Sequence, residues 1–349
     1  MKVSAEKLTK LIAEIYMKHG LSREKAYMVA EPLVVANQRG MHSHGVMRAA
    51  HYLIRNELGG SDMLAEPTLI SETAMSAVLD ANTGLGSIAS FKAVQMAREK
   101  AEKNGFGAVL VKNSNHNGAG AYWVEKLCGD DMIGFMCTNT ERSMIAPGAK
   151  EPTVGNSPFT IGAPALTHPM VCLDVATSEA AFGKIMDYKA RGLSIPSNWA
   201  VDAEGQPTTD PAKAVSLMPF GNHKGYGLSV FVDILTGLLA GGLFGKDVHK
   251  IYGEQNIPQG ITHFFFAMRI DLFRDVNEFR ADMDKYIDDI HAVRKAEGKE
   301  VYLPGEIEYL RTKESLKTGV DIPDSVMEEL LVQAKKAGVD TEGLGHCAD

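Results

Sequence analysis

The first part of the chain has the hydrophobic spacing of helices. Apolar residues recur every three or four positions after the capping-type residue Ser4: Leu8, Leu11, Ile12 and Ile15. Ser22 begins a second stretch with the same spacing, over residues 26–33. Because positions three and four apart lie on one face of a helix, residues 4–58 predict a helical N-terminal unit.

The pattern changes between about residues 74 and 200, where short apolar runs alternate with helical stretches and glycine-rich turns. The runs predict strands at 77–80, 108–111 and 133–137, and the stretches between them predict helices at 87–104 and 118–128. A buried core helix over 225–240 and a strand over 262–268 follow. Strands that alternate with helices are typical of a layered α/β domain.

The tail from residue 275 onward is helical in pattern and strongly charged, so we expect it to return across the surface of the N-terminal unit. The chain would then have three parts. These are an N-terminal helical part (1–73), an α/β domain (74–270) and a C-terminal helical part that returns to the first (271–349).

The composition excludes several classes of protein. The 349 residues include 36 Lys and Arg against 44 Asp and Glu, a net charge of −8, and this acidic balance argues against nucleic-acid binding. The N-terminus has no apolar signal region, and Asp233 interrupts the most apolar stretch, 225–244. We therefore expect neither secretion nor a membrane span.

The cysteines indicate a reducing compartment. The four of them are scattered and form no C-x-x-C pair: Cys128, Cys137, Cys172 and Cys347. This spacing predicts a cytoplasmic protein with neither a disulfide framework nor a zinc knuckle.

The densest group of polar side chains lies between two predicted helices, at Arg39-Gly40-Met41-His42-Ser43-His44-Gly45, with Arg48 and Tyr52 shortly after it. Histidine is suited to proton transfer near neutral pH, Ser43 could orient a ring, and the Arg48 guanidinium fits a carboxylate. The same residues could instead cap and cover a helix end. A metal site is a third interpretation, but His-x-His without a nearby third ligand is a weak zinc signature.

A second polar cluster, Asn113-Ser114-Asn115-His116-Asn117-Gly118, follows the strand predicted at 108–111 and opens the next helix. Side chains at the end of such a strand commonly face a ligand crevice. His116 is therefore a second candidate for acid–base chemistry, although a turn histidine bonded to local backbone is an equally ordinary reason for it.

Gly84-Leu85-Gly86-Ser87-Ile88-Ala89 matches the dinucleotide-binding pattern G-x-G-x-x-A. Three residues separate it from the preceding strand, and Glu102 is a poor ribose ligand because it lies in a lysine-rich helix. A tight turn that starts a helix is the favoured interpretation.

Three further segments could bind anions or simply start helices: Asp174–Ser178, Lys224–Gly227 and Pro304–Glu306. The ammonium of Lys224, at a glycine-flanked helix start, is a reasonable phosphate contact.

These segments, in this order, resemble the malate/L-lactate dehydrogenase family that is unrelated to the Rossmann-type enzymes of those names. The resemblance covers residues 1 to about 310 and also includes Gly183-Lys184, Ile195-Pro196, Trp199–Asp202 and Pro207–Pro211. The resemblance to the ureidoglycolate dehydrogenase branch extends along the whole chain.

The resemblance implies a nicotinamide-dependent oxidoreductase. Its nucleotide-binding domain would surround a largely antiparallel sheet, its helical domain would come from both chain ends, and it would form a homodimer with the cofactor cleft near the interface. This overturns the dinucleotide-fingerprint interpretation of Gly84–Ala89.

The resemblance also assigns roles by position. His116 looks like the proton acceptor of the ureidoglycolate branch, and His44 with Ser43 resembles the proton-relay pair of the imino-acid reductases. Arg48 looks like a ligand of the substrate carboxylate, with Tyr52 beside it. The positions that resemble cofactor contacts are Thr140, Asp174, Val175, Ala176, Lys224, Gly305 and Glu306.

Two positions depart from the family pattern. Gly155-Asn156-Ser157-Pro158 stands where many members have Gly-Thr-Asn-Pro, so Asn156 changes a position that touches substrate in some relatives. Lys184 stands where the imino-acid reductases carry a relay Asp, which disfavours that activity.

The sequence therefore predicts hydride transfer between a nicotinamide and C2 of a small 2-hydroxy acid, of the malate, lactate, sulfolactate or ureidoglycolate type. NAD is the expected cofactor, with NADP possible, and no nucleic acid or membrane partner is expected. Oxidation should rise with pH through the imidazole pKa, about 6.5 before any perturbation. The alternatives are a metal-dependent hydrolase that uses His42, His44 and His116, and an inactive dimeric binding protein of the same fold.

Overall fold

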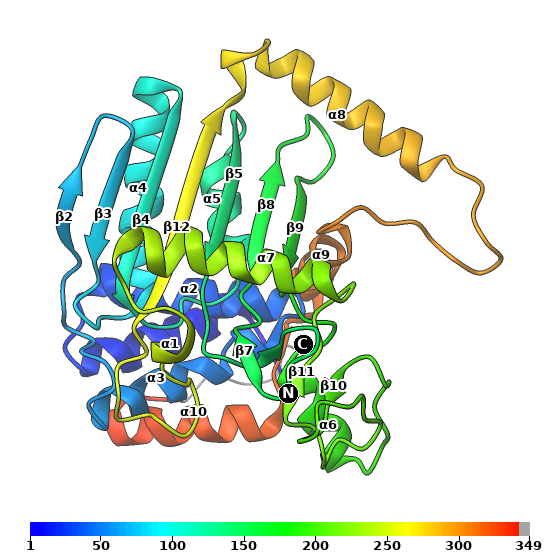
Figure 1. Cartoon of the computed structure of the whole chain (residues 1–349). Helices are drawn as coiled ribbons and strands as arrows, with labels where there is room; N and C mark the ends of the chain where they lie inside the picture. Colours follow the sequence, from blue (N-terminus) through cyan, green and yellow to red (C-terminus); the bar gives the residue numbers. More distant parts are fainter. Residues whose placement is uncertain (342–349) are drawn as a thin grey trace.

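The computed structural model describes residues 1–341 (Figure 1); Cys347 and the end of the predicted C-terminal part lie outside them. The α-helices are α1 (Ala5–Lys18), α2 (Arg23–Gln38), α3 (Met47–Glu57), α4 (Gly86–Asn104), α5 (Gly120–Cys128), α6 (Phe182–Ala190), α7 (His223–Asp233), α8 (Val276–His291), α9 (Glu306–Thr318) and α10 (Asp324–Ala337). The strands are β1 (Lys2–Val3), β2 (Thr68–Glu72), β3 (Ser76–Asp80), β4 (Phe106–Ser114), β5 (Met132–Thr138), β6 (Met144–Ile145), β7 (Pro152–Val154), β8 (Phe159–Ala163), β9 (Val171–Val175), β10 (Ala200–Val201), β11 (Ser216–Leu217), β12 (Ile261–Arg269) and β13 (Val320–Asp321).

A seven-stranded sheet forms the centre of the α/β part, in the order β2-β3-β4-β12-β5-β8-β9. Only β3 and β4 pair in parallel, and the other neighbours are antiparallel. The late strand β12 lies between β4 and β5, with Phe265 opposite both Val109 and Met136. The predicted α/β fold with a largely antiparallel sheet is confirmed.

Helices cover both faces of this sheet (Figure 1). On one face α4 and α5 pack against β4, β5 and β8, and fully buried side chains such as Trp123 and Phe265 fill the layer between them. On the other face α7 crosses in front of the strands. Helix α4 ends at Gly105, whose φ of +89° suits a glycine at that position.

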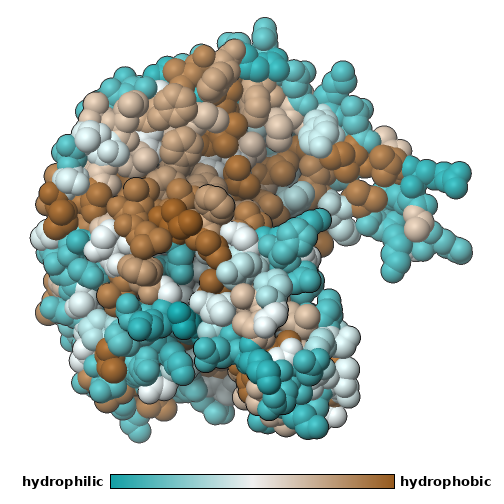
Figure 2. All heavy atoms as spheres, in the orientation of Figure 1, coloured by the Kyte–Doolittle hydropathy of each residue, from teal (hydrophilic) through white to brown (hydrophobic). Residues whose placement is uncertain are grey.

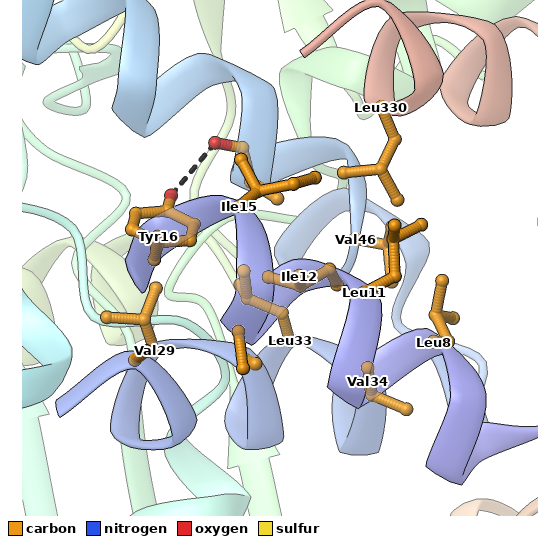
Figure 3. Close-up of a cluster of buried hydrophobic side chains, with 14 of the residues drawn as sticks. Leu8, Leu11, Ile12, Ile15, Tyr16, Val29, Leu33, Val34, Val46 and Leu330 are labelled. Atoms are coloured by element: carbon orange, nitrogen blue, oxygen red, sulfur yellow. Dashed lines mark hydrogen bonds between the residues drawn. The ribbon is translucent and has the colours of Figure 1, made fainter. Parts of the chain in front are cut away.

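The helical unit is built from both chain ends, as expected. Helices α1, α2, α3 and α10 bury a common apolar core that includes Leu8, Ile12, Leu33 and Leu330 (Figure 3). Within it the Tyr16 hydroxyl donates to the carbonyl oxygen of Ala49 at 2.9 Å. Strand β1 pairs with β13, so the first residues of the chain close against residues 320 and 321.

The helix predicted over 225–240 exists, but the expectation that it is a buried core helix is wrong. Helix α7 continues as a π-helical turn, Ile234–Leu238. Apolar side chains on its outer face are exposed, with Phe231 63% and Leu239 61% accessible. Figure 2 shows an apolar band along this helix. The sequence predicted burial because an exposed apolar face has the same composition as a core helix.

The expected course of the C-terminal tail is correct only in part. Helices α9 and α10 pack against the helical unit, α9 on α2 and α10 on α1 and α3. Helix α8 does not return there but extends from the end of β12 beyond the sheet (Figure 1). The Asp284 carboxylate accepts the backbone N–H groups of Leu166 and Thr167 and so fixes α8 to the loop before β9.

The division of the chain at residues 74 and 271 stays a prediction, although the first strand of the main sheet already begins at Thr68. A smaller four-stranded sheet, β10-β11-β6-β7, packs with α6 into a separate lobe. None of the helices in residues 1–341 is both long and apolar enough to cross a membrane.

Candidate active site

The segment between α2 and α3 is a tight 3₁₀ turn, His42–His44, held by Asn37. The Asn37 side chain accepts the backbone N–H of Val46 at 2.7 Å and contacts Nδ1 of His42 at 2.9 Å. A Cβ on Gly45 would lie 1.8 Å from the Asn37 oxygen, so only glycine fits there. His42 is exposed and serves the turn, as the capping interpretation of this residue expects.

The turn brings His44 next to His116, which comes from the loop after β4. The two ring centroids are 5.2 Å apart. Each ring has a hydroxyl neighbour: Ser43 Oγ lies 2.9 Å from Nδ1 of His44, and Tyr52 Oη lies 2.6 Å from Nδ1 of His116. The two polar clusters of the sequence therefore form one site between the helical unit and the sheet.

The loop that carries His116 is fixed from several sides. The Asn115 side chain donates to the carbonyl oxygens of Thr83 and Gly84, and Gln259 Oε1 accepts the His116 backbone N–H at 3.0 Å. A Cβ on Gly86 would lie 2.0 Å from the Asn115 carbonyl oxygen. The glycines of the apparent dinucleotide motif therefore let α4 start against the histidine loop, in agreement with the favoured helix-start interpretation.

His263 on the central strand β12 lies beneath this loop and is fully buried. Its Nδ1 lies 2.8 Å from Thr138 Oγ1 and its Nε2 lies 3.0 Å from Ser114 Oγ. It is a satisfied core histidine that fixes the ends of β4 and β5 beside the site.

Both candidate proton-transfer histidines favour the neutral state. Burial, reinforced by the Arg48 guanidinium, lowers the pKa of His44 to about 4. Burial also lowers the pKa of His116 well below its ordinary value, with Arg48 and His44 as further causes. The ordinary imidazole pKa near 6.5 therefore applies to neither ring, and both favour the neutral state at neutral pH.

Arg48 is buried behind the histidines. Its Nε donates to the carbonyl oxygen of Ser43 and its Nη1 donates to the Tyr252 hydroxyl, each at 2.7 Å. Tyr252 lies in a loop that Arg55 fixes by donating to the carbonyl oxygens of Ile251 and Ile257. The guanidinium of Arg48 is thus held in one orientation, and its Nη2 has no hydrogen-bond partner among residues 1–341.

Two neighbouring cavities lie on either side of Met41 and Asp174, and Arg48 lines neither of them. The histidine cavity, of about 150 Å³, is lined by His44, His116, Thr140, Asn156, Ala176, His263 and other residues. The Arg39 cavity, of about 340 Å³, is lined by Arg39, Cys172, Val175, Tyr302, Gly305, Glu308 and other residues. Met41 and Asp174 line both cavities, which are therefore neighbours and are together called the cleft.

The cleft contains most of the residues that resemble cofactor contacts. Thr140, Asp174, Val175, Ala176 and Gly305 line it. Glu306 lies just behind: its Oε2 accepts the Leu303 N–H at 3.0 Å and contacts His291 Nε2 at 2.9 Å. Lys224, at the start of α7, is exposed and lines neither cavity.

The cleft has features that fit a dinucleotide. A Cβ on Gly305, where φ is +87°, would lie 2.9 Å from the Cys172 carbonyl oxygen, so this turn presents bare backbone to the cavity. Arg39 is 9% exposed, and its buried Nε has no hydrogen-bond partner among the described residues. Its Nη1 forms an ion pair with the exposed carboxylate of Glu125 at 3.6 Å, and a cation that lines an open cavity is suited to a phosphate.

Sequence reasoning missed Gln259 and Tyr252 as parts of the site. Both come from the loop before β12, far from either histidine in the sequence, and their polar side chains carry no local pattern. Arg39 is the first residue of the histidine motif, but the sequence pattern did not predict a function for it.

Within residues 1–341 no three His, Cys, Asp or Glu side chains gather as metal ligands. His42 is turned toward Asn37 and is exposed, so the metal trio of the hydrolase alternative does not form. Cys128, Cys137 and Cys172 are buried free thiols.

Comparisons with known proteins agree with this site. The malate/L-lactate dehydrogenase family matches residues 3–345. The chain is similar to a malate dehydrogenase of Pyrococcus abyssi (35% identity, 97% of this chain and 96% of the relative) and to the NAD(+) ureidoglycolate dehydrogenase of Escherichia coli O157:H7 (32%, 96% of each). The solved sulfolactate dehydrogenase of Methanocaldococcus jannaschii superposes with a TM-score of 0.92 (32% identity, 97% of this chain and 98% of that one).

Fold, site and relatives together define an NAD(P)-dependent hydroxyacid oxidoreductase. The chain belongs to the malate/L-lactate dehydrogenase family. The predicted family and enzyme class are confirmed, and the comparisons support neither the hydrolase nor the inactive binding protein.

Proposed function

We propose that this protein transfers hydride reversibly between a nicotinamide dinucleotide and C2 of a small 2-hydroxy or 2-oxo acid, with His116 exchanging the hydroxyl proton. The observation that carries the proposal is the pair of histidines, with ring centroids 5.2 Å apart, in a cavity that shares two lining residues with a second, larger cavity. The nicotinamide supplies the hydride chemistry, and the protein positions the acid and moves one proton.

Arg48 binds the substrate carboxylate in this proposal, because its orientation is fixed and its Nη2 is free of protein partners among residues 1–341. A planar guanidinium suits a carboxylate. Tyr52 follows Arg48 by four residues on α3, and Asn156 lines the histidine cavity with its Oδ1 near the hydroxyls of Thr140 and Ser143. The malate, lactate, sulfolactate and ureidoglycolate types are the substrate candidates.

The cofactor is proposed to be NAD. Asp174, Val175 and Ala176 with Thr140 would border it, and Gly305 and Glu306 would hold its other end. Two carboxylates, Asp174 and Glu308, line the Arg39 cavity. Acidic groups beside a ribose favour its hydroxyls over a 2′-phosphate. Among the relatives, the names of the E. coli and Chromohalobacter enzymes specify NAD(+) and NADP(+) respectively.

A homodimer with the cleft near the interface also belongs to the proposal. The exposed apolar side chains of α7 and the following turn form one band: Leu228, Phe231, Ile234, Leu238 and Leu239. A band of this kind on a folded chain marks a surface that a partner covers. Lys224 lies at the start of the same helix, where the partner's approach would complete its surroundings. A cytoplasmic location is proposed from the free buried thiols.

The test is a panel of 2-hydroxy and 2-oxo acids, including those of the malate, lactate, sulfolactate and ureidoglycolate types, each with NAD and NADP. The absorbance of the reduced nicotinamide should change with at least one acid. No change across the panel, with correctly folded protein that binds NADH, would contradict the proposal. Light scattering of the wild type and Phe231→Glu tests the dimer, which the substitution should convert to monomer.

A further inference from the structure

We propose that Tyr52 and His116 form a proton relay, in which the Tyr52 hydroxyl replaces on Nδ1 the proton that Nε2 of His116 gives to the C2 oxygen of a 2-oxo acid. Tyr52 is then a positioning residue that acts through His116. The inference rests on the proposed function, because the reacting acid is the one assigned there.

The protonation of the neutral His116 ring follows from its neighbours. Two groups approach Nδ1: the backbone N–H of Gly118 at 3.3 Å and the Tyr52 hydroxyl at 2.6 Å. A backbone N–H can only donate, so Nδ1 must carry the lone pair. The hydroxyl of Tyr52 then donates as well, and the proton of the neutral ring resides on Nε2.

Nε2 is the ring nitrogen that remains for a substrate. It has no hydrogen-bond partner in residues 1–341, and His116 lines the histidine cavity. Gln259 fixes the His116 backbone, and Tyr52 is only 5% exposed on α3, so neither ring is free to swing away. The resting site therefore presents an N–H donor, which suits the carbonyl oxygen of a 2-oxo acid.

His44 lacks this constraint. Its Nδ1 neighbour is the exposed hydroxyl of Ser43, which can donate or accept, and no backbone N–H is aimed at the ring. The geometry therefore assigns the relay to His116 and leaves His44 to contact the substrate.

In the reduction, C2 gains a C–H bond from the hydride of the reduced nicotinamide, which becomes oxidised, and the carbonyl π pair moves to oxygen. That oxygen takes the Nε2 proton while Nδ1 takes the Tyr52 hydroxyl proton. Burial raises the pKa of Tyr52 and Arg48 opposes that rise, so the phenolate must regain a proton from the solvent before the next turnover. Without Tyr52, a neutral ring that gave up its Nε2 proton would be left as an imidazolate.

The surroundings of His116 make the alternative donor, an imidazolium, scarce. The titratable and charged groups that face the ring are Arg48, His51 and Tyr52 of α3, His44 of the preceding turn and His263 of β12. None is a carboxylate, so nothing in this set stabilises a positive ring.

The relay predicts a particular pH profile for the reduction. Because a neutral ring donates, kcat/KM for the 2-oxo acid should be constant between about pH 6 and 9. A ring that had to be protonated first would lose roughly tenfold per pH unit over the same range. Such a decline in the wild type would overturn the relay.

Tyr52→Phe removes the hydroxyl and keeps the ring. We expect kcat/KM for the reduction at pH 8 to fall about 10- to 100-fold, NADH affinity to stay unchanged, and the remaining activity to decline with pH. Tyr16→Phe is the matched control, since it removes another buried hydroxyl of the helical unit that faces no cavity. Equal pH profiles for Tyr52→Phe and the wild type would contradict the relay.

A spectroscopic measurement separates this inference from the proposed function. In ¹⁵N-histidine NMR of the intact protein, with His116→Gln to assign the signal, Nδ1 of His116 should appear unprotonated and Nε2 protonated. A protonated Nδ1 in the neutral ring would overturn the relay even in an active enzyme. The expected tautomer would support it even if none of the acids in the panel reacted.

Discussion

The carboxylate of Asp174 accepts the backbone N–H of Ala121 at 2.8 Å with one oxygen and the Thr160 hydroxyl at 2.8 Å with the other. Asp174 therefore occupies the N-terminus of α5, where the helix dipole favours a negative charge. Burial nevertheless raises the pKa of this carboxyl. Because this helix end already holds a carboxylate, we expect a cofactor phosphate to lie instead near Arg39 and the turn before α9.

Asp174→Ala should lower the free energy of unfolding, because it leaves the N–H of Ala121 and the hydroxyl of Thr160 without partners. Two lost hydrogen bonds to a charged group should cost about 2–4 kcal/mol. Urea unfolding would measure it, with Asp289→Ala on the exposed side of α8 as control. An unchanged midpoint would mean that water replaces both bonds.

Arg48→Lys should raise the KM for the acid strongly, because an ammonium cannot reproduce the planar fork. The lost charge-assisted contact should cost about 1.5–3 kcal/mol in kcat/KM. Steady-state kinetics and NADH titration measure the two effects, and NADH affinity should hardly change. A KM within about twofold of the wild type would exclude Arg48 as the carboxylate ligand.

Lys224→Ala should weaken cofactor binding and leave the fold intact, since the exposed side chain has no protein partner in the described residues. Fluorescence titration with NADH measures the affinity, and the exposed Lys246→Ala is the matched control. Equal affinities in the two variants would make Lys224 an ordinary surface residue.

His116→Ala should lower kcat by about 10²- to 10⁴-fold with cofactor affinity nearly unchanged, as expected when a proton-transfer group is lost. His44→Ala should act mainly on KM. The reverse pattern, with kcat lost only in the His44 variant, would transfer the role to His44. If both variants kept kcat, neither ring would transfer the proton.

Acidification should destabilise the fold. Burial lowers the pKa of His51 and of His263 to about 4, with Arg48 and Arg55 adding to the effect at His51. Below pH 6.5 the unfolded chain binds protons at these histidines while the folded chain does not, so stability falls as the pH drops toward 4. Each of the two histidines should lower the free energy of unfolding by up to about 3 kcal/mol at pH 4 relative to neutral pH.

The midpoint of urea unfolding, measured between pH 7.5 and 4.5, tests this prediction. In His51→Gln the midpoint should depend less steeply on pH. His42→Gln, at an exposed position, serves as the control. A midpoint that does not depend on pH in this range would refute the prediction.

The sequence predicted the local elements well because they depend on neighbours along the chain. The strand at Phe106–Ser114 and the helix at Gly86–Asn104 follow from spacing and from the glycines at their ends. The two histidine clusters were also visible. Their 5.2 Å separation was not, because it depends on how the helical unit packs on the sheet.

The exposure of α7 and the long-range hydrogen bonds of the site could not be predicted from the sequence. Phe231 has the same hydrophobicity whether a core or a partner surrounds it, so the burial of α7 was assigned wrongly. The hydrogen bond from Arg48 to Tyr252 joins residues 204 positions apart and leaves no periodic signal.

The pairing of β1 with β13 has a consequence for how activity arises during synthesis. Strand β12, at the centre of the main sheet, and strand β13, which closes the helical unit, both leave the ribosome late. Earlier segments can form helices, but contacts between residues so distant in sequence form slowly. His44 and His116 should therefore meet only after nearly the whole chain has emerged, and a chain truncated before residue 320 should lack a working catalytic centre.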